Sequence, residues 1–150
     1  SGIMNIKVKR LNEKAKMPFR ATEGSAGADL CACIDESVVI NPKERMLVPT
    51  GLAVEIPMGF GGFVFPRSSV ASKSGVSLSN CVGVIDSDYR GEVKIAIINH
   101  GTDAYTINDG DRIAQLVILP VDMCSYTEDK ELSDTERGQG GFGSTGIGSV

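Results

Sequence analysis

The chain has 150 residues, of which 41% are hydrophobic and 23% are charged. A domain of this size and composition can bury a hydrophobic core, which excludes a disordered chain. The net charge of −4 argues against a bulk nucleic-acid binder, and no apolar run approaches the roughly 20 residues of a membrane span. With no apolar leader visible, we expect a cytoplasmic protein without a nucleic-acid or membrane partner.

Short β-branched runs separated by turn signals predict an all-β domain. In chain order, we expect a strand that begins with the carboxylate of Asp29 after a glycine turn, and then strands at residues 37–40, 51–56, 63–65, 81–85, 93–99 and 112–120. Turn signals between them include Asn41-Pro42, Pro49-Thr50-Gly51 and Asn108-Asp109-Gly110. A spacing of about 8–12 residues between strands is typical of a sandwich or barrel. The sequence also predicts a short helix over residues 69–73, between Pro66 and Gly75.

The four cysteines do not form a pattern that binds a metal. They are Cys31, Cys33, Cys81 and Cys124. No Cys-x-x-Cys pair is present and His100 is the only histidine, which disfavours a zinc site. We therefore expect four reduced thiols that fill space within the strands.

The end of the chain is rich in glycine and has two interpretations. Residues 137–146 contain single examples of several useful groups: the cation Arg137, the aromatic ring of Phe142, and the adjacent hydroxyls of Ser144 and Thr145. A flexible tail would explain the composition. Alternatively, the segment is mobile when empty and becomes ordered over a phosphorylated ligand, to which these groups would bind.

Asp86 is the candidate for acid–base chemistry. The apolar run 81–85 leads into this carboxylate, and a polar turn and a second strand from Glu92 follow it. A carboxylate at the end of a hairpin strand can orient and deprotonate a water molecule. The alternative is that Asp86 and Asp88 are turn residues that bond their own backbone.

Residues 67–69, Arg-Ser-Ser, lie at the start of the predicted helix and suit a phosphate group. The alternative is a serine N-cap beside a surface arginine. Gln115 lies between apolar residues of a predicted strand. It is either a solvent-facing position or a buried hydrogen-bonding group.

Taken together, the motifs resemble those of the trimeric all-β dUTP nucleotidohydrolases, the dUTPases. Five motifs of that family occur in order: residues 26–30 (AGADL), 66–69 (PRSS), Asn80 with 83–91 (GVIDSDYRG), 110–116 (GDRIAQL) and 137–146 (RGQGGFGSTG). The resemblance implies a jelly-roll-like β-barrel with one short helix and a flexible C-terminal arm. It also implies a homotrimer whose active sites are shared between subunits. We expect a catalytic barrel at residues 1–127 and a linker and arm at 128–150.

The resemblance implies that the protein cleaves dUTP to dUMP and pyrophosphate. That reaction supplies dUMP for dTMP synthesis and keeps uracil out of DNA. Asp86 would be the general base for a water that attacks the α-phosphorus. Mg²⁺ would bridge phosphate oxygens and keep most of its waters, and Asp29 would orient those waters.

The resemblance also implies which residues bind the substrate. The uracil pocket would comprise Asn80 and the backbone of Val84, Ile85 and Lys94, and Tyr89 would lie under the deoxyribose. The phosphates would bind Arg67, Ser68, Ser69 and Gln115. From the arm, Phe142 would stack on the uracil, while Arg137, Gly143, Ser144 and Thr145 would close over the γ-phosphate.

Two departures and two alternative functions remain open. Many family members have glycine where this chain has Ser69, and an aromatic residue where it has Ala28. A related dCTP deaminase would need a catalytic carboxylate within residues 93–99, and that stretch contains none. A non-catalytic regulatory trimer that binds dUTP is the other alternative.

Overall fold

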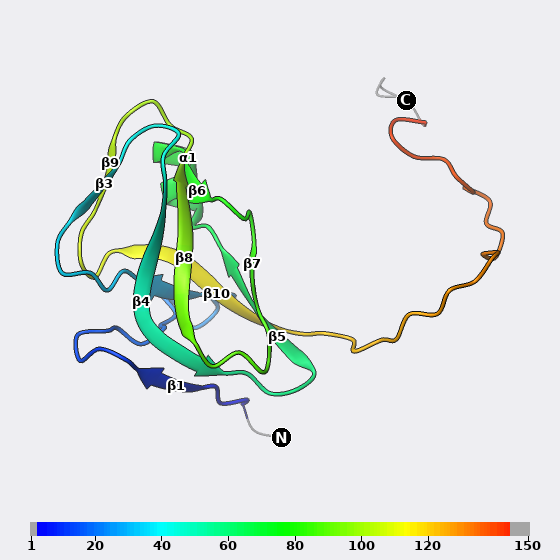
Figure 1. Cartoon of the computed structure of the whole chain (residues 1–150), viewed down its shortest axis with the longest axis horizontal. Coiled ribbons are helices and arrows are strands. Elements are labelled where there is room, and N and C mark those ends of the chain that lie inside the picture. Colours follow the sequence, from blue (N-terminus) through cyan, green and yellow to red (C-terminus); the bar gives the residue numbers. More distant parts are fainter. Residues whose placement is uncertain (1–2, 145–150) are drawn as a thin grey trace.

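The structure is a computed structural model that describes residues 3–144. Within that range the chain forms strands and one helix (Figure 1). The strands are β1 (Lys7–Arg10), β2 (Ala28–Cys31), β3 (Val38–Ile40), β4 (Arg45–Glu55), β5 (Phe60–Phe65), β6 (Val76–Leu78), β7 (Gly83–Ile85), β8 (Glu92–Asn99), β9 (Tyr105–Ile107) and β10 (Arg112–Pro120). The helix α1 (Ser68–Ser74) has seven residues, too few to cross a bilayer.

Two antiparallel sheets enclose the hydrophobic core. One has the strand order β1-β4-β8-β6 and the other β2-β10-β5-β7, while β3 pairs with β9 at the edge of the molecule (Figure 1). Side chains of β8 alternate between buried and more exposed positions, as expected for a strand with one face on the core. Leu30, Ile40, Leu52, Ile95 and Ile107 are at most 1% exposed. This arrangement confirms the predicted all-β, jelly-roll-like class.

The predicted turn at residues 49–51 is wrong, because β4 runs through it as one strand. The pairing with β8 changes register there: Pro49 lies opposite Lys94, but Ala53 lies opposite Glu92. Extra residues on one strand make a bulge, where proline and a left-handed glycine are tolerated. Gly51 has a φ of +69°, a backbone conformation typical of turns. Here that conformation belongs to the bulge within β4 and does not end the strand.

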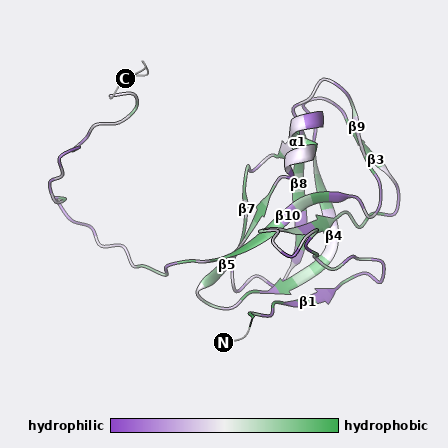
Figure 2. Cartoon of the chain, turned by 180° about the vertical axis from the view of Figure 1, so that it is seen from behind, coloured by the Kyte–Doolittle hydropathy of each residue, from purple (hydrophilic) through white to green (hydrophobic). Residues whose placement is uncertain are grey.

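Three short strands were not predicted from the sequence. β1, β6 and β9 have four, three and three residues, too few for a local pattern to stand out. β1 is mostly hydrophilic, with Val8 as its one apolar residue, whereas β5 and β7 are mostly hydrophobic (Figure 2). Such strands are defined by the partner that they pair with, in this case β4, β8 and β3.

The cysteines divide into a buried and an exposed pair. Cys31 and Cys33 are buried free thiols, and burial raises the pKa of both above its ordinary value, which keeps them neutral. Cys31 fills space within β2 as predicted, whereas Cys33 is buried just after that strand. Cys81 and Cys124 are exposed, so the expectation that all four pack inside strands is wrong for these two.

After β10 the chain leaves the barrel and extends away from it (Figure 1). The amide of Val121 still donates to the carbonyl of Gly59 at 2.8 Å. Beyond that residue, every hydrogen bond of the described segment is internal to it. We call residues 121–144 the C-terminal extension. The exact boundary predicted at residue 127 stays a prediction.

Candidate functional site

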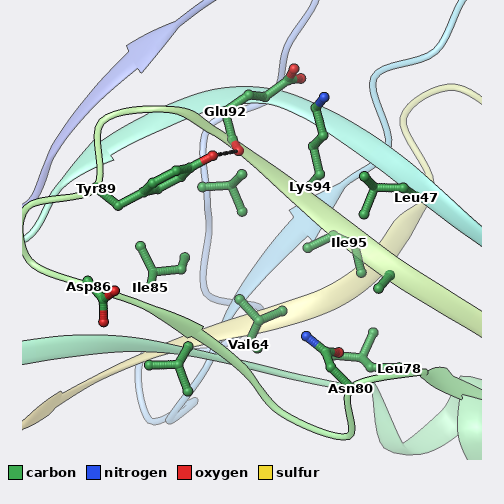
Figure 3. A pocket seen from close by; sticks show the side chains of 14 residues that line it. Leu47, Val64, Leu78, Asn80, Ile85, Asp86, Tyr89, Glu92, Lys94 and Ile95 are labelled. Atoms are coloured by element: carbon green, nitrogen blue, oxygen red, sulfur yellow. Dashed lines mark hydrogen bonds between the residues drawn. The ribbon is translucent and has the colours of Figure 1, made fainter.

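A cavity of about 430 Å³ opens between β7 and β8 (Figure 3). We call it the β7–β8 cavity. It is lined by Leu47, Val64, Leu78, Asn80, Gly83, Val84, Ile85, Asp86, Tyr89, Glu92, Val93, Lys94, Ile95 and Ala96. All six barrel residues predicted for the nucleoside and for general-base chemistry are in this set: Asn80, Val84, Ile85, Asp86, Tyr89 and Lys94.

The cavity exists because β7 and β8 do not pair with each other, contrary to the predicted hairpin ladder. Within residues 3–144, β7 pairs with β5 in one sheet, while β8 pairs with β4 and β6 in the other. The pairing of β8 with β6 covers only Ile97–Asn99. The remaining edge of β8 and the outer edge of β7 therefore border the cavity with backbone groups as well as side chains.

Asp86 directly follows β7 and lies with Tyr89 at one end of the cavity, while Asn80 and Leu78 lie at the other (Figure 3). The carbonyl of Asp86 accepts the turn hydrogen bond from the Tyr89 amide at 3.1 Å. Its exposed carboxylate makes no hydrogen bond to the protein within the described range. The backbone of Asp86 therefore makes the hydrogen bond of the turn, and its side chain remains available for chemistry.

Tyr89 is fixed against the start of β8. Its hydroxyl donates to the carbonyl of Glu92 at 2.8 Å, and its ring crosses Gly91, where a Cβ would lie 2.4 Å from the Tyr89 hydroxyl oxygen. The backbone hydrogen bond is the one that a core tyrosine would make. However, Tyr89 is 45% exposed, so it forms a cavity wall and is not part of the core.

Arg90 braces the turn that carries Asp86. Its Nη1 donates to the carbonyl of Ser87 at 2.6 Å and to that of Tyr89 at 3.2 Å. Its Nη2 lies 3.6 Å from a carboxylate oxygen of Glu55 on β4. These contacts tie the turn to the neighbouring sheet.

A second cleft, of about 290 Å³, gathers the residues predicted to bind phosphate. We call it the arginine pocket. It is lined by Ala21, Ser25, Ala26, Gly27, Asp29, Arg67, Ser68, Ser69 and Gln115. Strand β10 brings these segments together, because Gln115 lies opposite Asp29 of β2 on one side and Phe65 of β5 on the other.

Gln115 is half-buried and makes a specific hydrogen bond, which decides between its two interpretations. Its Nε2 donates to the carbonyl of Pro66 at 3.0 Å. A Cβ on Gly27 would lie 2.4 Å from Oε1 of Gln115, so only glycine leaves room there for the side-chain amide of Gln115. The glutamine therefore supports the backbone just before Arg67.

The serine N-cap alternative for Arg67–Ser69 is wrong. Arg67 is itself the N-cap of α1, and no side-chain hydrogen bond caps the helix. The Arg67 side chain is only 21% exposed and its Nε lies 3.3 Å from Oδ1 of Asp29. Asp29 is buried, and its Oδ2 lies 3.5 Å from Nη1 of Arg112.

No protein cage for a metal ion exists in the described residues, since no group of three or more His, Cys, Asp or Glu side chains is suitably placed. Asp29 offers its carboxylate in the arginine pocket, but both of its oxygens already contact arginines. Any ion held here would need most of its ligands from a substrate or from water.

The described part of the fifth motif, residues 137–144, lies on the C-terminal extension, outside both clefts. Arg137 donates from Nε to the carbonyl of Gly140 at 2.6 Å, and the Ser144 amide donates to the carbonyl of Gly141 at 3.0 Å. Phe142 is fully exposed and has a φ of +50°, and Gly143 follows it at +85°. Thr145 lies outside the described residues.

Several lining residues were not predicted as site residues. Leu47 reaches the cavity because it lies opposite Ala96 across the β4–β8 ladder. Glu92 contributes through its carbonyl, which holds Tyr89. Neither residue carries a local sequence signal, because both positions follow from strand pairing.

The fold and the two clefts define a class: jelly-roll-like domains with a ligand cavity between the edges of two sheets and a separate arginine-lined pocket. The sequence model of the dUTPase family matches residues 13–146. The chain belongs to the dUTPase family.

Known relatives are similar over nearly the whole chain. The deoxyuridine 5'-triphosphate nucleotidohydrolase of Desulfitobacterium hafniense is 51% identical over 148 residues, which covers 95% of this chain and 98% of that protein. The enzyme of the same name from Hydrogenobaculum sp. is 51% identical over 144 residues, covering 96% and 99%.

Solved structures of phage dUTPases share the fold. The dUTPase of Staphylococcus bacteriophage 80alpha with dUpNHpp has a TM-score of 0.87 and 33% identity, covering 95% of this chain and 99% of that one. A point mutant of the dUTPase from S. aureus phage phi11, described with a structural Mg(II) ion, has a TM-score of 0.78 and 30% identity, covering 85% and 98%.

Proposed function

We propose that the protein hydrolyses dUTP to dUMP and pyrophosphate. The observation that carries this proposal is that Asp86 shares one cavity with Asn80, Val84, Ile85, Tyr89 and Lys94. Relatives that are 51% identical carry the name of this activity, and a similar phage enzyme was solved with the analogue dUpNHpp. The reaction would supply dUMP and keep dUTP from DNA synthesis.

The nucleoside would bind in the β7–β8 cavity. The edges of β7 and β8 lack a common ladder there, so backbone groups of Val84, Ile85 and Lys94, with the Asn80 amide, can pair with the polar edge of uracil. Such a site rejects cytosine, which would leave those groups unpaired once the bound base covers them. The fixed ring of Tyr89 would lie against the deoxyribose and leave no room for a 2′-hydroxyl.

The phosphates would bind in the arginine pocket. Arg67 supplies a guanidinium whose fork matches phosphate oxygens, and Ser68 and Ser69 add hydroxyl and amide donors on the same wall. Gln115 would hold phosphate oxygens and their waters while it supports Pro66. Ser69 has an amide like the glycine of many relatives, and it therefore retains that donor.

Asp86 would act as the general base. In this step its carboxylate takes a proton from water, the water oxygen attacks the α-phosphorus, and the bond from phosphorus to the bridging oxygen breaks. Pyrophosphate leaves with that oxygen. The exposed, unpaired carboxylate at the end of the cavity suits this task, since the base must reach the water directly.

Mg²⁺ would be held mainly by the triphosphate and by waters. The donor set of this chain fits such binding, because the described residues contain no carboxylate cluster that could hold the ion alone. When bound, the ion would neutralise charge that develops on the phosphate oxygens. Asp29 is the residue predicted to contact its waters.

The C-terminal extension would close over the bound nucleotide. The exposed ring of Phe142 would contribute binding free energy by stacking on the base. Arg137, Gly143, Ser144 and Thr145 would approach the γ-phosphate. The extension makes no hydrogen bond to its own barrel after Val121 among the described residues. This separation is consistent with closure over a site on another subunit.

We further propose a homotrimer with shared active sites. The β7–β8 cavity and the arginine pocket have no lining residue in common, and residues 137–144 of the fifth motif lie apart from both. A complete site would therefore combine the cavity of one subunit, the pocket of a second and the extension of a third.

A panel of deoxynucleoside triphosphates tests the reaction. We expect pyrophosphate release from dUTP and not from dCTP, dTTP or UTP when Mg²⁺ is present. Ammonia release from dCTP would show the deaminase alternative to be correct. Tight dUTP binding without turnover would show the regulatory alternative to be correct.

A mixing experiment tests the shared sites. A chain that ends after Glu136 and a full chain with Asp86→Asn should each be inactive alone. Mixed and reassembled, they should recover part of the activity, because some sites then contain an intact base and an intact extension. No recovery at any mixing ratio would contradict the shared-site arrangement.

A further inference from the structure

Asp29 is a carboxylate almost enclosed by the protein, and both of its oxygens contact arginines. Its side chain is 12% exposed; Oδ1 lies 3.3 Å from Nε of Arg67, and Oδ2 lies 3.5 Å from Nη1 of Arg112. A carboxylate removed from water destabilises the fold unless it is paired. The two guanidinium groups explain how Asp29 is accommodated there.

The same contacts restrict the rotation of Arg67. Its Nε faces Asp29, and its Nη1 donates to the carbonyl of Arg112 at 3.3 Å. A guanidinium is a planar fork with five N–H groups, so two held nitrogens define the plane and the direction of the third, Nη2. That nitrogen has no protein partner among residues 3–144, and Arg67 lines the arginine pocket.

We propose that Asp29 is a positioning residue that holds the Arg67 guanidinium in the orientation that binds a phosphate group of the nucleotide. This inference rests on the proposed dUTP hydrolysis and deepens it. It differs from a role in orienting metal-bound water, because positioning acts on the free protein and requires no metal ion.

A double-mutant cycle on the full-length chain tests the proposal. The affinity for dUpNHpp is measured by calorimetry, once in EDTA and once with Mg²⁺. Asp29→Asn keeps the shape of the side chain and removes its charge. In EDTA it should weaken binding by about 10- to 100-fold, as expected for hydrogen bonds to charged groups. In an Arg67→Gln background the same change should alter affinity by less than about twofold, because the positioned group is already gone.

Two controls separate positioning from a general loss of structure. Asp35→Asn removes a carboxylate that also pairs with a cation, Lys14, but is 95% exposed, and it should leave dUpNHpp affinity unchanged. Deoxyuridine has no phosphate, so the Asp29→Asn chain should bind it as tightly as the unchanged chain does.

Three results would overturn the inference. Additive losses in the double variant would show that Asp29 does not act through Arg67. A loss seen only with Mg²⁺ would assign Asp29 to metal-bound water, and an equal loss of deoxyuridine binding would make its role structural. Failure of the unchanged chain to bind dUpNHpp in either condition would be a different failure, one that overturns the proposed function itself.

Discussion

The two clefts are built in different ways. The β7–β8 cavity is bordered by strand edges that belong to different sheets, so backbone groups of those edges border it beside the polar side chains of Asn80, Asp86 and Tyr89. The arginine pocket depends on oriented side chains: the Asp29–Arg67 ion pair and the hydrogen bond from Gln115 to Pro66. A base with a fixed polar edge suits a rigid backbone, whereas phosphate oxygens suit side chains that carry charge. Most side chains of the cavity should therefore tolerate change, apart from those that react, stack or form a wall.

Asp86→Asn should have the largest effect of any single substitution in the cavity. It removes the base and keeps the size of the side chain, so turnover should fall by about 10²- to 10⁴-fold while dUpNHpp affinity changes little. Steady-state kinetics and calorimetry measure the two quantities. Asp88→Asn, in the same exposed turn, is the matched control and should remain active. A near-normal rate for Asp86→Asn would refute the assignment of the base.

Phe142→Ala should have the next largest effect. Loss of stacking on a base costs about 1–3 kcal/mol, which corresponds to a fall of roughly 5- to 150-fold in kcat/KM for dUTP. The melting temperature should not change, because Phe142 is fully exposed. Phe142→Tyr keeps a ring and should retain most activity.

Leu132→Ala is the control for the C-terminal extension. Leu132 is also an exposed apolar residue of that segment, at 89%, but it lies before the fifth motif. Its replacement should leave kcat/KM unchanged. Equal losses for Phe142→Ala and Leu132→Ala would indicate a general effect of the extension and would argue against stacking.

Much of this arrangement could be predicted from the sequence, because the relevant signals are local. The long apolar strands β8 and β10, the short helix and the motif residues around Asp86 all follow from neighbouring residues. What could not be predicted depends on pairing between distant segments. The run Pro49–Gly51 carries a genuine turn signal, yet the ladder with β8 continues past it as a bulge.

The separation of β7 from β8 is the most consequential feature that the sequence did not reveal. A polar turn between two apolar runs predicts a paired hairpin. Instead, β7 adds to β5 and β8 adds to β4, and the cavity lies between them. The contact of Asp29 with both Arg67 and Arg112 was likewise not predictable, since three strands or loops far apart in sequence must meet to form it.

Gly91→Ala should have an intermediate effect. The added Cβ would lie 2.4 Å from the Tyr89 hydroxyl oxygen, so the ring must move and lose its hydrogen bond to Glu92. A net loss of about 1 kcal/mol predicts a fall of roughly fivefold in kcat/KM for dUTP and weaker discrimination against UTP. Gly24→Ala, where a Cβ would meet nothing within 4 Å, should change neither quantity. Unchanged discrimination in Gly91→Ala would show that the Tyr89 wall does not exclude the 2′-hydroxyl.

Val84→Ala should have the smallest effect, and it tests the backbone character of the cavity most directly. Val84 lies in the centre of β7 and is 64% exposed, so truncation removes apolar surface but no backbone group. Exposed substitutions of this kind change stability by about 0.5 kcal/mol or less, and kcat/KM for dUTP should stay within about twofold. Val84→Thr, which keeps the branched shape, should behave in the same way. A tenfold loss in Val84→Ala that Val84→Thr restores would mean that the side chain contacts the base, and the distinction between a backbone-built cavity and a side-chain-built pocket would fail.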